Sequence, residues 1–266
     1  TESARFFLYA KQINQLASLI LASQRLVVFT GAGVSTESGI SDFRSPGGLW
    51  ERYDPDDFTI RKFLHSVETR KKMWHMMATE FLVDIQPNAA HHALAELDKL
   101  GKLDCVITQN VDDLHQRAGV PRDKVYELHG NMLRAVCLTC GQRYPMEAIR
   151  ERLKAGEEIP DCKYCHGILK PTGVFFGESL PARELQEATT HSKKADVFLI
   201  IGSTLLVYPA AYMPQYAVEA GAKLAIVNLT ATPIDKDAEV VINGKAGEVM
   251  TQVVEMVKSG IITDRK

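Results

Sequence analysis

The sequence contains no apolar run close to the roughly 20 residues that a membrane-spanning helix needs. Its first residues, TESARFFLYAKQINQLASLI, also lack the basic, apolar and small-residue regions that follow one another in a secretory signal peptide. These two absences predict a cytoplasmic protein that does not bind a membrane.

The chain also has very little net charge. Its 31 lysines and arginines and 33 aspartates and glutamates give a formal charge of -2 at pH 7. Direct binding of nucleic acid normally needs a basic face or tail, so we expect no direct contact with nucleic acid. A hydrophobic content of 45% and a charged content of 24% are typical of a soluble globular protein.

Cysteine is scarce, with five in 266 residues, and a chain of this length builds a core without needing disulfides. Four of the five form two Cys-x-x-Cys pairs with 21 residues between them, slightly more than in a short zinc ribbon. Four thiolates fill the tetrahedral shell of Zn²⁺ and leave no place for a catalytic water. We therefore predict one structural zinc, with the ligands Cys137, Cys140, Cys162 and Cys165. Redox pairs or ordinary buried thiols are the alternatives, and Cys105 is expected only to pack in a strand.

Short β-branched or apolar runs alternate with helical patterns along most of the chain. This alternation predicts an α/β fold with a parallel, doubly wound sheet of the Rossmann type. Strands are predicted over residues 25–30, 104–108, 125–128, 197–202, 223–228 and 239–242. Helices are predicted over residues 88–100, with Asn88 as N-cap and Gly101 as the stop, and over residues 209–220.

Two stretches interrupt this alternation. Residues 45–85 combine a Pro-Gly-Gly loop with helical segments rich in Trp, Met and Phe, and residues 131–170 hold the cysteine pairs. We therefore predict a helical module and cofactor loop over 45–85, a zinc-binding lobe over 131–170, and a Rossmann-type domain made of residues 1–44, 86–130 and 171–266.

A glycine-rich turn, TGAGVSTESGI, follows the first predicted strand at residues 30–40. Glycines in such a turn let backbone N–H groups approach a pyrophosphate, although a tight turn without a ligand is the simpler alternative. A dehydrogenase is not indicated, because the G-x-G-x-x-G spacing is missing. In addition, PGGLWERYDPDD stands where a second strand should end in a ribose-binding acid.

From residue 17 to residue 258 the chain resembles the sirtuin family. The resemblance rests on GAGVSTESGISDFR, TQNVDDLH and ELHGN, then the Cys-x-x-Cys pairs, and then VFFGE, IGSTLLVYPA, IVNLT and GKAGEV. Ser41 and Ser45 stand where the family has proline and glycine, and Ser203-Thr204 reverses the commoner order. None of these departures removes a group that the chemistry needs.

The resemblance implies an NAD-dependent protein-lysine deacylase, in particular a deacetylase of the prokaryotic type. In this family NAD is consumed: the acyl oxygen attacks C1′ of the nicotinamide ribose, and nicotinamide leaves. The products are free lysine, nicotinamide and O-acetyl-ADP-ribose, so the expected partners are acetylated or otherwise acylated lysines of proteins. The alternatives are a mono-ADP-ribosyltransferase, a lysine deacylase of broader range, and a non-catalytic module that senses NAD.

The same resemblance assigns the catalytic residues. His129 is the expected general base, Asn110 orders the ribose or a water, and Asp112 holds the nicotinamide carboxamide. The expected NAD contacts are Gly31, Ala32, Gly33, Thr36, Asp42, Phe43, Arg44, Gln109, Asn110, Val111, Asp112, His129, Gly202, Ser203, Thr204, Asn228, Leu229, Lys245 and Ala246. The expected acyl-peptide contacts, which would accept the substrate as an added β-strand, are Val174, Phe175, Phe176 and Gly177.

The acyl group and the other histidines allow two further predictions. Family members that remove acidic acyl groups carry a tyrosine and an arginine where an ungapped reading places His75 and Ala78 here. With Met76 and Met77 close by, we predict a preference for acetyl and other neutral acyl groups. The histidines other than His129, His91 and His115 among them, are interpreted as structural or surface groups.

Overall fold

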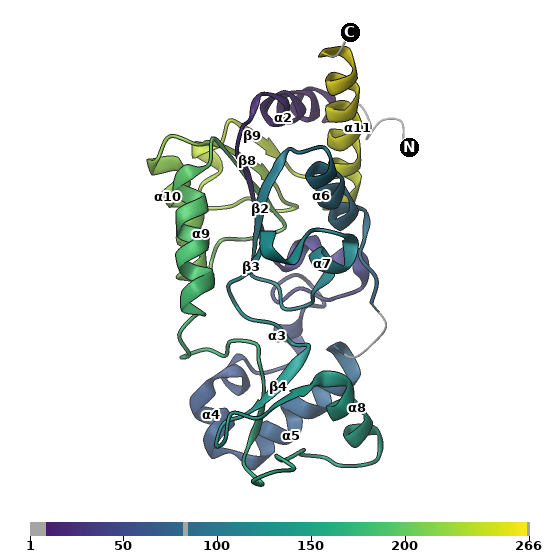
Figure 1. Ribbon diagram of the computed structural model, residues 1–266, viewed down its shortest axis with the longest axis vertical. Coiled ribbons are helices and arrows are strands. Elements are labelled where there is room, and N and C mark those ends of the chain that lie inside the picture. The colour runs from purple at the N-terminus through teal and green to yellow at the C-terminus, as the bar shows by residue number, and fades with distance from the viewer. Residues whose placement is uncertain (1–8, 82–84, 265–266) are drawn as a thin grey trace.

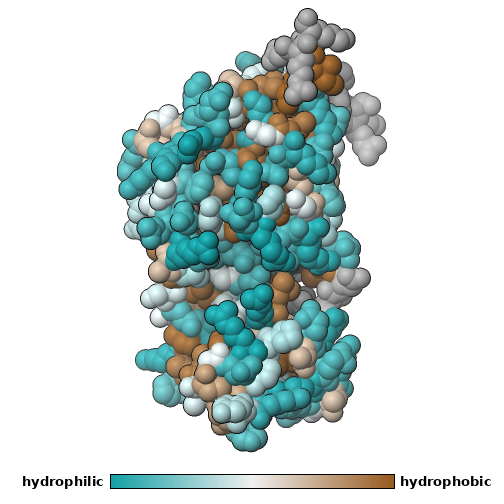
Figure 2. Space-filling model, viewed as in Figure 1, coloured by the Kyte–Doolittle hydropathy of each residue, from teal (hydrophilic) through white to brown (hydrophobic). Residues whose placement is uncertain are grey.

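The computed structural model describes residues 9–81 and 85–264. Figure 1 shows an elongated molecule with two parts, a large α/β part that carries both ends of the described chain and a small part at the opposite end. On the face drawn in Figure 2, hydrophilic side chains cover most of the surface, and apolar side chains show around the level where the two parts meet.

The large part is built on a six-stranded sheet with the order β3-β2-β1-β7-β8-β9. Every neighbouring pair is parallel. The strands are β1 (Leu26–Thr30), β2 (Leu103–Thr108), β3 (Val125–Glu127), β7 (Val197–Ile201), β8 (Lys223–Val227) and β9 (Val240–Ile242). The six predicted strands and the fold class are therefore confirmed. The strand order reverses between β1 and β7, and in open α/β sheets ligands bind at such a reversal.

Helices cover both faces of this sheet (Figure 1). One apolar cluster joins one side of the sheet to α2 (Ala10–Ala22), α6 (Ala89–Lys99) and α11 (Ala246–Asp264). A second cluster joins the other side to α9 (Ala182–Lys194), η6 (Ala210–Tyr212) and α10 (Met213–Glu219). As predicted, Asn88 caps α6 through its side chain, and Gly101 follows the helix at a φ of 70°. The other predicted helix begins with the 3-10 turn η6.

The small part combines both insertions. A three-stranded antiparallel sheet has the order β5-β4-β6, formed by β4 (Arg134–Cys137), β5 (Arg143–Pro145) and β6 (Leu169–Pro171). Its helices are α3 (Leu49–Arg52), α4 (Ile60–His65), α5 (Val67–Met76) and α8 (Met146–Lys154), with the 3-10 turn η3 (Pro55–Phe58) and a π-helical turn, η4 (Met77–Phe81). Trp74 and Met77 share a core with Cys137 and Cys162, so the two insertions pack together. The predicted domain boundaries stay a prediction.

Short elements complete the chain. They are the 3-10 turns η1 (Ala32–Val34), η2 (Thr36–Ser38), η5 (Arg122–Lys124) and η7 (Asp235–Asp237), and the one-turn helix α7 (Leu114–Ala118). Two of them, η1 and η2, directly follow β1, and α7 lies a few residues beyond the end of β2. They therefore lie at the edge of the sheet where the parallel strands end.

Candidate active site

A cleft of about 320 Å³ lies where the carboxyl ends of the sheet strands face the small part. It is lined by residues that follow β1, β2, β7 and β8, and by the segment that follows β6. All but one of the predicted NAD and peptide contacts line this single cleft, the exception being Gly31. The structure thus brings together side chains that are more than 200 positions apart in the sequence, such as Ala32 and Ala246.

Glycines allow two turns to meet at the floor of this cleft. The N–H of Gly31 donates to the Ile201 carbonyl at 3.1 Å, and that of Gly33 donates to the Gly202 carbonyl at 2.8 Å. A Cβ atom on Gly33 would lie 2.8 Å from the Gly202 Cα, and one on Gly202, whose φ is 63°, would lie 2.2 Å from the Val34 nitrogen. The predicted glycine-rich turn therefore serves close packing between the ends of β1 and β7. The resulting Cβ-free floor fits the close approach of a dinucleotide.

His129 occupies the cleft just beyond β3 and is half-buried there. Its Nδ1 lies 3.0 Å from the Gln109 carbonyl oxygen. A carbonyl only accepts hydrogen bonds, so Nδ1 carries the proton and Nε2 of the neutral ring keeps a free lone pair. Burial lowers the pKa of His129 below its ordinary value of 6.5, and the bond to the carbonyl offsets part of that shift. The ring is therefore neutral and basic at pH 7, as a general base requires.

Ser35 connects the two other predicted catalytic side chains. Its Oγ donates to Asp112 Oδ2 at 2.7 Å and accepts from Asn110 Nδ2 at 3.1 Å. Asp112 Oδ1 also accepts from the Leu114 N–H at 3.0 Å. The carboxylate and the amide are thus held in fixed positions at the cleft wall. The sequence interpretation did not single out Ser35, although it lies inside the glycine-rich motif.

Two buried histidines lie behind Ser35. The Asn88 N–H donates to His91 Nδ1 at 3.2 Å, so the proton of the neutral ring is on Nε2, which lies 3.4 Å from Ser35 Oγ. His115 packs against His91 with ring centroids 4.9 Å apart, and its Nε2 lies 2.9 Å from Thr30 Oγ1. Burial lowers the pKa of His91 to about 3, with a further contribution from His115, and burial lowers the pKa of His115 to about 4.

Both histidines are therefore neutral at pH 7 and form part of the support of the site. The prediction that they are structural groups was right for their burial. It missed that His91 reaches Asp112 through Ser35 and that His115 packs on His91. The position of a histidine on a helix does not show which side chain it contacts. A usable signal was present: His91 is the third residue of α6, where its ring can serve the cap of the helix.

The loop after the glycine-rich turn is held by its own carboxylate. Asp42 Oδ1 accepts from the N–H groups of Arg44 and Ser45 at 3.0 and 2.8 Å, and its Oδ2 accepts from Ser45 Oγ at 2.6 Å. The Phe43 ring packs on Trp50 with centroids 5.0 Å apart. Asp42 therefore shapes the loop, while Phe43 and Arg44 line the cleft.

The predicted peptide segment connects the catalytic loop to the small part. The Val174 N–H donates to the His129 carbonyl at 2.8 Å. Phe176 donates to the Phe58 carbonyl at 2.9 Å and accepts from the Ile60 N–H at 3.0 Å. Because these bonds are internal, an added peptide strand has few donors to use. Among the described residues, the N–H of Gly177 has no acceptor and is available to such a strand.

A buried ion pair fixes the same segment from behind. Lys170 Nζ lies 2.9 Å from Glu178 Oε2, and it donates to the carbonyls of Pro171 and Gly173 at 3.0 and 2.7 Å. The same carboxylate oxygen accepts from the Phe175 N–H at 2.7 Å, and Nζ lies 4.2 Å from the Phe175 ring centroid. Burial lowers the pKa of Lys170, and Glu178 offsets part of that shift. The sequence interpretation missed this lysine, which resembles a surface residue when read alone.

The far end of the cleft contains the residues predicted to contact the adenosine. Ser203 Oγ donates to Gln109 Oε1 at 2.8 Å, which joins the ends of β7 and β2. Asn228 Nδ2 donates to the Thr230 carbonyl at 2.8 Å, whereas the Leu229 side chain is 63% exposed. The exposed Leu229 side chain at the mouth is thus available to an adenine ring.

The prediction of which residues face the acyl group was wrong by a shift along the helix. Met76 and Met132 line the cleft beside Val174. His75 and Ala78 are exposed and do not line it, so the ungapped reading placed the wrong residues in the pocket. The physical reason is that α5 ends in the π-helical turn η4, whose wider turn rotates side chains relative to an α-helix.

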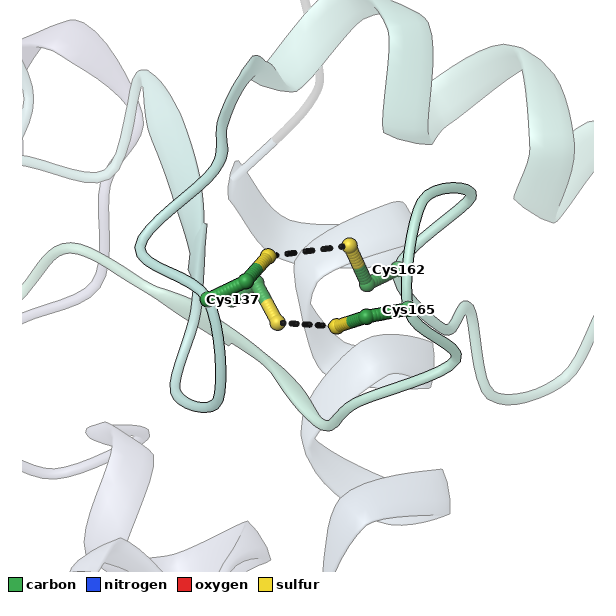
Figure 3. Close-up of side chains that lie close together, drawn as sticks. Cys137, Cys162 and Cys165 are labelled. Carbon is green, nitrogen blue, oxygen red and sulfur yellow. Dashed lines mark hydrogen bonds between the residues drawn. The ribbon is translucent and has the colours of Figure 1, made fainter.

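The four predicted zinc ligands converge in the small part. Figure 3 shows the side chains of three of them, Cys137, Cys162 and Cys165, close together. Their sulfurs all lie within 4.8 Å of one another, with 3.5 Å between Cys137 and Cys165 and 3.7 Å between Cys140 and Cys162. Zn–S bonds of about 2.3 Å in a tetrahedron put sulfurs about 3.8 Å apart, so the set fits Zn²⁺.

Within this cluster the surrounding groups favour the thiolate of Cys162. Desolvation raises the pKa of Cys162. Hydrogen bonds from the Tyr144 hydroxyl, 3.1 Å from the sulfur, and from the N–H groups of Cys165 and Tyr164 outweigh that effect and lower the pKa to about 6. Cys105 lies elsewhere, fully buried in an apolar cluster of the large sheet, as predicted.

The model of the Sir2 family matches residues 31–209, more than half of the 266-residue chain. The chain belongs to the Sir2 family. The sirtuin resemblance drawn from its motifs is thereby confirmed.

Two relatives of this Sir2 protein cover nearly its whole length. An NAD-dependent protein deacetylase of Thermodesulfovibrio yellowstonii is 44% identical over 253 residues, which are 94% of this chain and 97% of that protein. NAD-dependent protein deacetylase 1 of Pyrobaculum aerophilum is 45% identical over 250 residues, which are 93% of this chain and 95% of that protein.

Solved Sir2 structures match the fold just as fully. A complex of Sir2 with deacetylated p53 peptide and 3′-O-acetyl-ADP-ribose superimposes with a TM-score of 0.86 at 38% identity, covering 91% of this chain and 97% of that one. A Sir2 complex with p53 peptide and NAD⁺ superimposes with a TM-score of 0.84 at 38% identity, covering 93% and 98%. In the part of this Sir2 protein that the structure describes, no helix is long and apolar enough to cross a membrane.

Proposed function

We propose that this Sir2 protein is an NAD-dependent protein-lysine deacetylase in which His129 is the general base. Its products are free lysine, nicotinamide and O-acetyl-ADP-ribose. One observation carries the proposal: a single cleft holds the Cβ-free floor of the glycine-rich turn, the segment Val174–Gly177 and an imidazole whose Nε2 is unprotonated. NAD and an acetylated lysine therefore meet beside a base.

His129 accepts a proton from a ribose hydroxyl through Nε2, because its other nitrogen is committed to the Gln109 carbonyl. Asp112, held by Ser35 and the Leu114 N–H, is positioned to accept a hydrogen bond from the nicotinamide carboxamide. Asn110, which is 8% exposed, orders the ribose or a water from the same wall. Because these groups are fixed before NAD binds, little reorganisation remains for the reaction.

The remaining contacts follow the length of the cleft. We assign the pyrophosphate and adjoining riboses to the turn formed by Ala32, Gly33 and Thr36 and to the Gly202–Thr204 segment, with Phe43 and Arg44 covering them. The adenosine is assigned to Asn228, Leu229, Lys245 and Ala246. Zn²⁺ at the four cysteines stabilises the small part and takes no part in the chemistry, because its ligand shell is complete.

The test replaces His129 by alanine and compares it with His92→Ala, an exposed histidine on α6. Each variant is incubated with NAD and an acetylated peptide, and nicotinamide release and O-acetyl-ADP-ribose are measured. We expect His129→Ala to lose at least about 10²-fold in turnover while keeping its zinc and melting temperature. Near-normal turnover would remove His129 from the mechanism. Transfer of labelled ADP-ribose to protein without deacetylation would favour the ADP-ribosyltransferase alternative.

We also propose a cytoplasmic location. The four-thiolate set that fits zinc needs reduced cysteines, which a reducing compartment maintains. Fractionation of cells that express the protein checks this location.

A further inference from the structure

Three tyrosines, two of them exposed, form a row that leaves the mouth of the cleft. Tyr208, Tyr212 and Tyr216 recur every four residues: Tyr208 precedes η6, Tyr212 ends η6 and Tyr216 lies in α10. The ring centroids of Tyr208 and Tyr212 are 4.7 Å apart, and those of Tyr212 and Tyr216 are 6.2 Å apart. Tyr208 is 53% exposed and Tyr212 is 41% exposed, whereas Tyr216 is half-buried against the apolar cluster on that side of the large sheet. We call these three residues the tyrosine row.

The row is continuous with the cleft. Leu206 and Tyr208 line the cleft itself, and Leu206 is 54% exposed. From there η6 and α10 run away from the carboxyl edge of the sheet, because α10 packs beside β7 and β8 and leads back to the start of β8. A polypeptide whose acyl-lysine enters the cleft therefore has this row as the next surface on that side.

Helix stability by itself explains only part of the arrangement. Aromatic side chains four residues apart support a helix by a few tenths of a kcal/mol, which would account for Tyr212 and Tyr216. Tyr208 lies before the helix begins and still continues the row. Exposed aromatic side chains that gather beside an opening are typical of recognition surfaces, since tyrosine offers an apolar ring and a hydroxyl at a low cost in conformational entropy.

We propose that the tyrosine row binds the extended segment of the substrate polypeptide that flanks the acyl-lysine. The proposal rests on the proposed deacetylase function, because it needs the lysine to enter the same cleft. Alternate side chains of an extended chain repeat every ~7 Å on one face, and the step of 6.2 Å between the Tyr212 and Tyr216 rings comes nearest to that repeat. Apolar or aromatic side chains of the flank would pack on the two exposed rings of the row, those of Tyr208 and Tyr212.

The outer end of the row carries a positive charge. Lys193 of α9 lies with its Nζ 5.3 Å from the Tyr216 ring centroid. That ring face already has its cation, so a lysine or arginine of the flank is disfavoured there, and a neutral or acidic side chain is favoured. The row thus adds a preference for the sequence around the modified lysine, at a distance from the acyl group.

The experiment compares two acetylated peptides that differ only in length. The short one carries a single residue on each side of the lysine, and the long one is extended on both sides with apolar residues and a distal acid. We expect Tyr212→Ala to raise KM for the long peptide by about 2–10-fold, the range that aromatic stacking supplies, and to leave its kcat and all constants of the short peptide unchanged. Tyr212→Phe should behave as the wild type, and so should Val218→Ala, an exposed control on the adjoining helix α10.

The outcomes separate two failures. If the wild type does not deacetylate the short peptide, the proposed function is wrong. If it does, but Tyr212→Ala leaves KM of the long peptide unchanged, the tyrosine row does not bind the flank. A rise in KM that is equal for both peptides, or a lowered melting temperature with lowered kcat, would show a structural role and also overturn the proposal.

Discussion

The two parts of the molecule keep their shape by different means. In the large part, β1 and β7 are buried along their whole length, and apolar clusters cover both faces of the sheet. In the small part, the sheet has three short strands, and both end residues of β5 are exposed. The core of the small part is completed by the cysteines themselves, because Cys137 and Cys162 belong to its apolar cluster. A buried sheet supports the chemistry on one side of the cleft, whereas a metal cluster supports the substrate side.

Removing the zinc should have the largest effect, because it should destabilise the small part and leave the large part folded. We expect Cys162→Ala to lose the metal, to unfold the small part and to abolish deacetylation, since a structural zinc contributes about 10 kcal/mol or more to folding. The large part should keep a separate, higher melting transition. Calorimetry together with metal analysis checks this. Cys105→Ala is the matched control, and it should retain one zinc per chain and near-normal turnover.

If Cys162→Ala kept its zinc, the assignment of the ligands would be wrong. If it lost zinc yet melted in one unchanged transition, the small part would not depend on the metal, and the contrast between the two parts would disappear.

The ion pair behind the peptide segment is the next test, because it lies where the two parts meet. Lys170→Met should lower the free energy of unfolding by about 2 kcal/mol. Breaking a fully buried ion pair costs ~3–5 kcal/mol, but the Glu178 side chain is 26% exposed and water can solvate its charge. It should also raise KM for the acetylated peptide more than it lowers kcat, since the segment Val174–Gly177 loses its anchor. Urea unfolding and steady-state kinetics measure both effects.

The control for this pair is the double variant Lys170→Met/Glu178→Gln. It should recover part of the lost stability, because it no longer leaves a carboxylate without its partner. A Lys170→Met protein with unchanged KM would mean that the pair stabilises the fold without positioning the substrate.

Acid should weaken the large part through its two neutral histidines. The folded pKa values of His91 and His115, about 3 and about 4, lie below the ordinary value of 6.5. Between these values the unfolded chain binds more protons, so stability is complete above pH 6.5 and falls as the pH is lowered toward 4. His115 by itself accounts for at most about 3 kcal/mol over that range. His115→Gln should flatten the pH dependence of the unfolding free energy, and an equally steep profile in this variant would exclude His115 as the cause.

The smallest effect concerns the acyl group, whose pocket is lined from both parts by apolar side chains such as Met76 and Val174. We expect kcat/KM on one peptide to be at least about tenfold higher for acetyl- than for succinyl-lysine, because a carboxylate among these side chains lacks a cation. Met76→Ala should enlarge the pocket, so that longer neutral acyl groups gain about 1 kcal/mol of transition-state binding relative to the wild type. A succinyl value equal to the acetyl value would mean that a cation reaches the pocket.

Much of this protein follows from local patterns in the chain. Buried runs predicted the six parallel strands, and the spacing of four cysteines predicted their cluster, whereas His129 as general base came from the resemblance of its motif to the sirtuin family and stays a proposal. The strands and the cysteine cluster depend on residues close in sequence: strand burial on neighbouring residues, and the pairs of metal ligands on a short turn. Physical constraints of this kind act over a few residues, so the sequence by itself contains them.

The tertiary structure alone decided which buried polar groups meet. Ser35, His91 and His115 come from three separate segments, and they touch only because the ends of β1 and β2 and the start of α6 meet at one edge of the sheet. Lys170 is buried because the chain folds back over it at Glu178. Met76 lines the cleft and His75 lies outside it, and the π-helical turn at Met77–Phe81 lies between these residues and Pro87, from which the ungapped reading counted back. A buried polar side chain takes its role from the partner that satisfies it, and long-range packing chooses that partner.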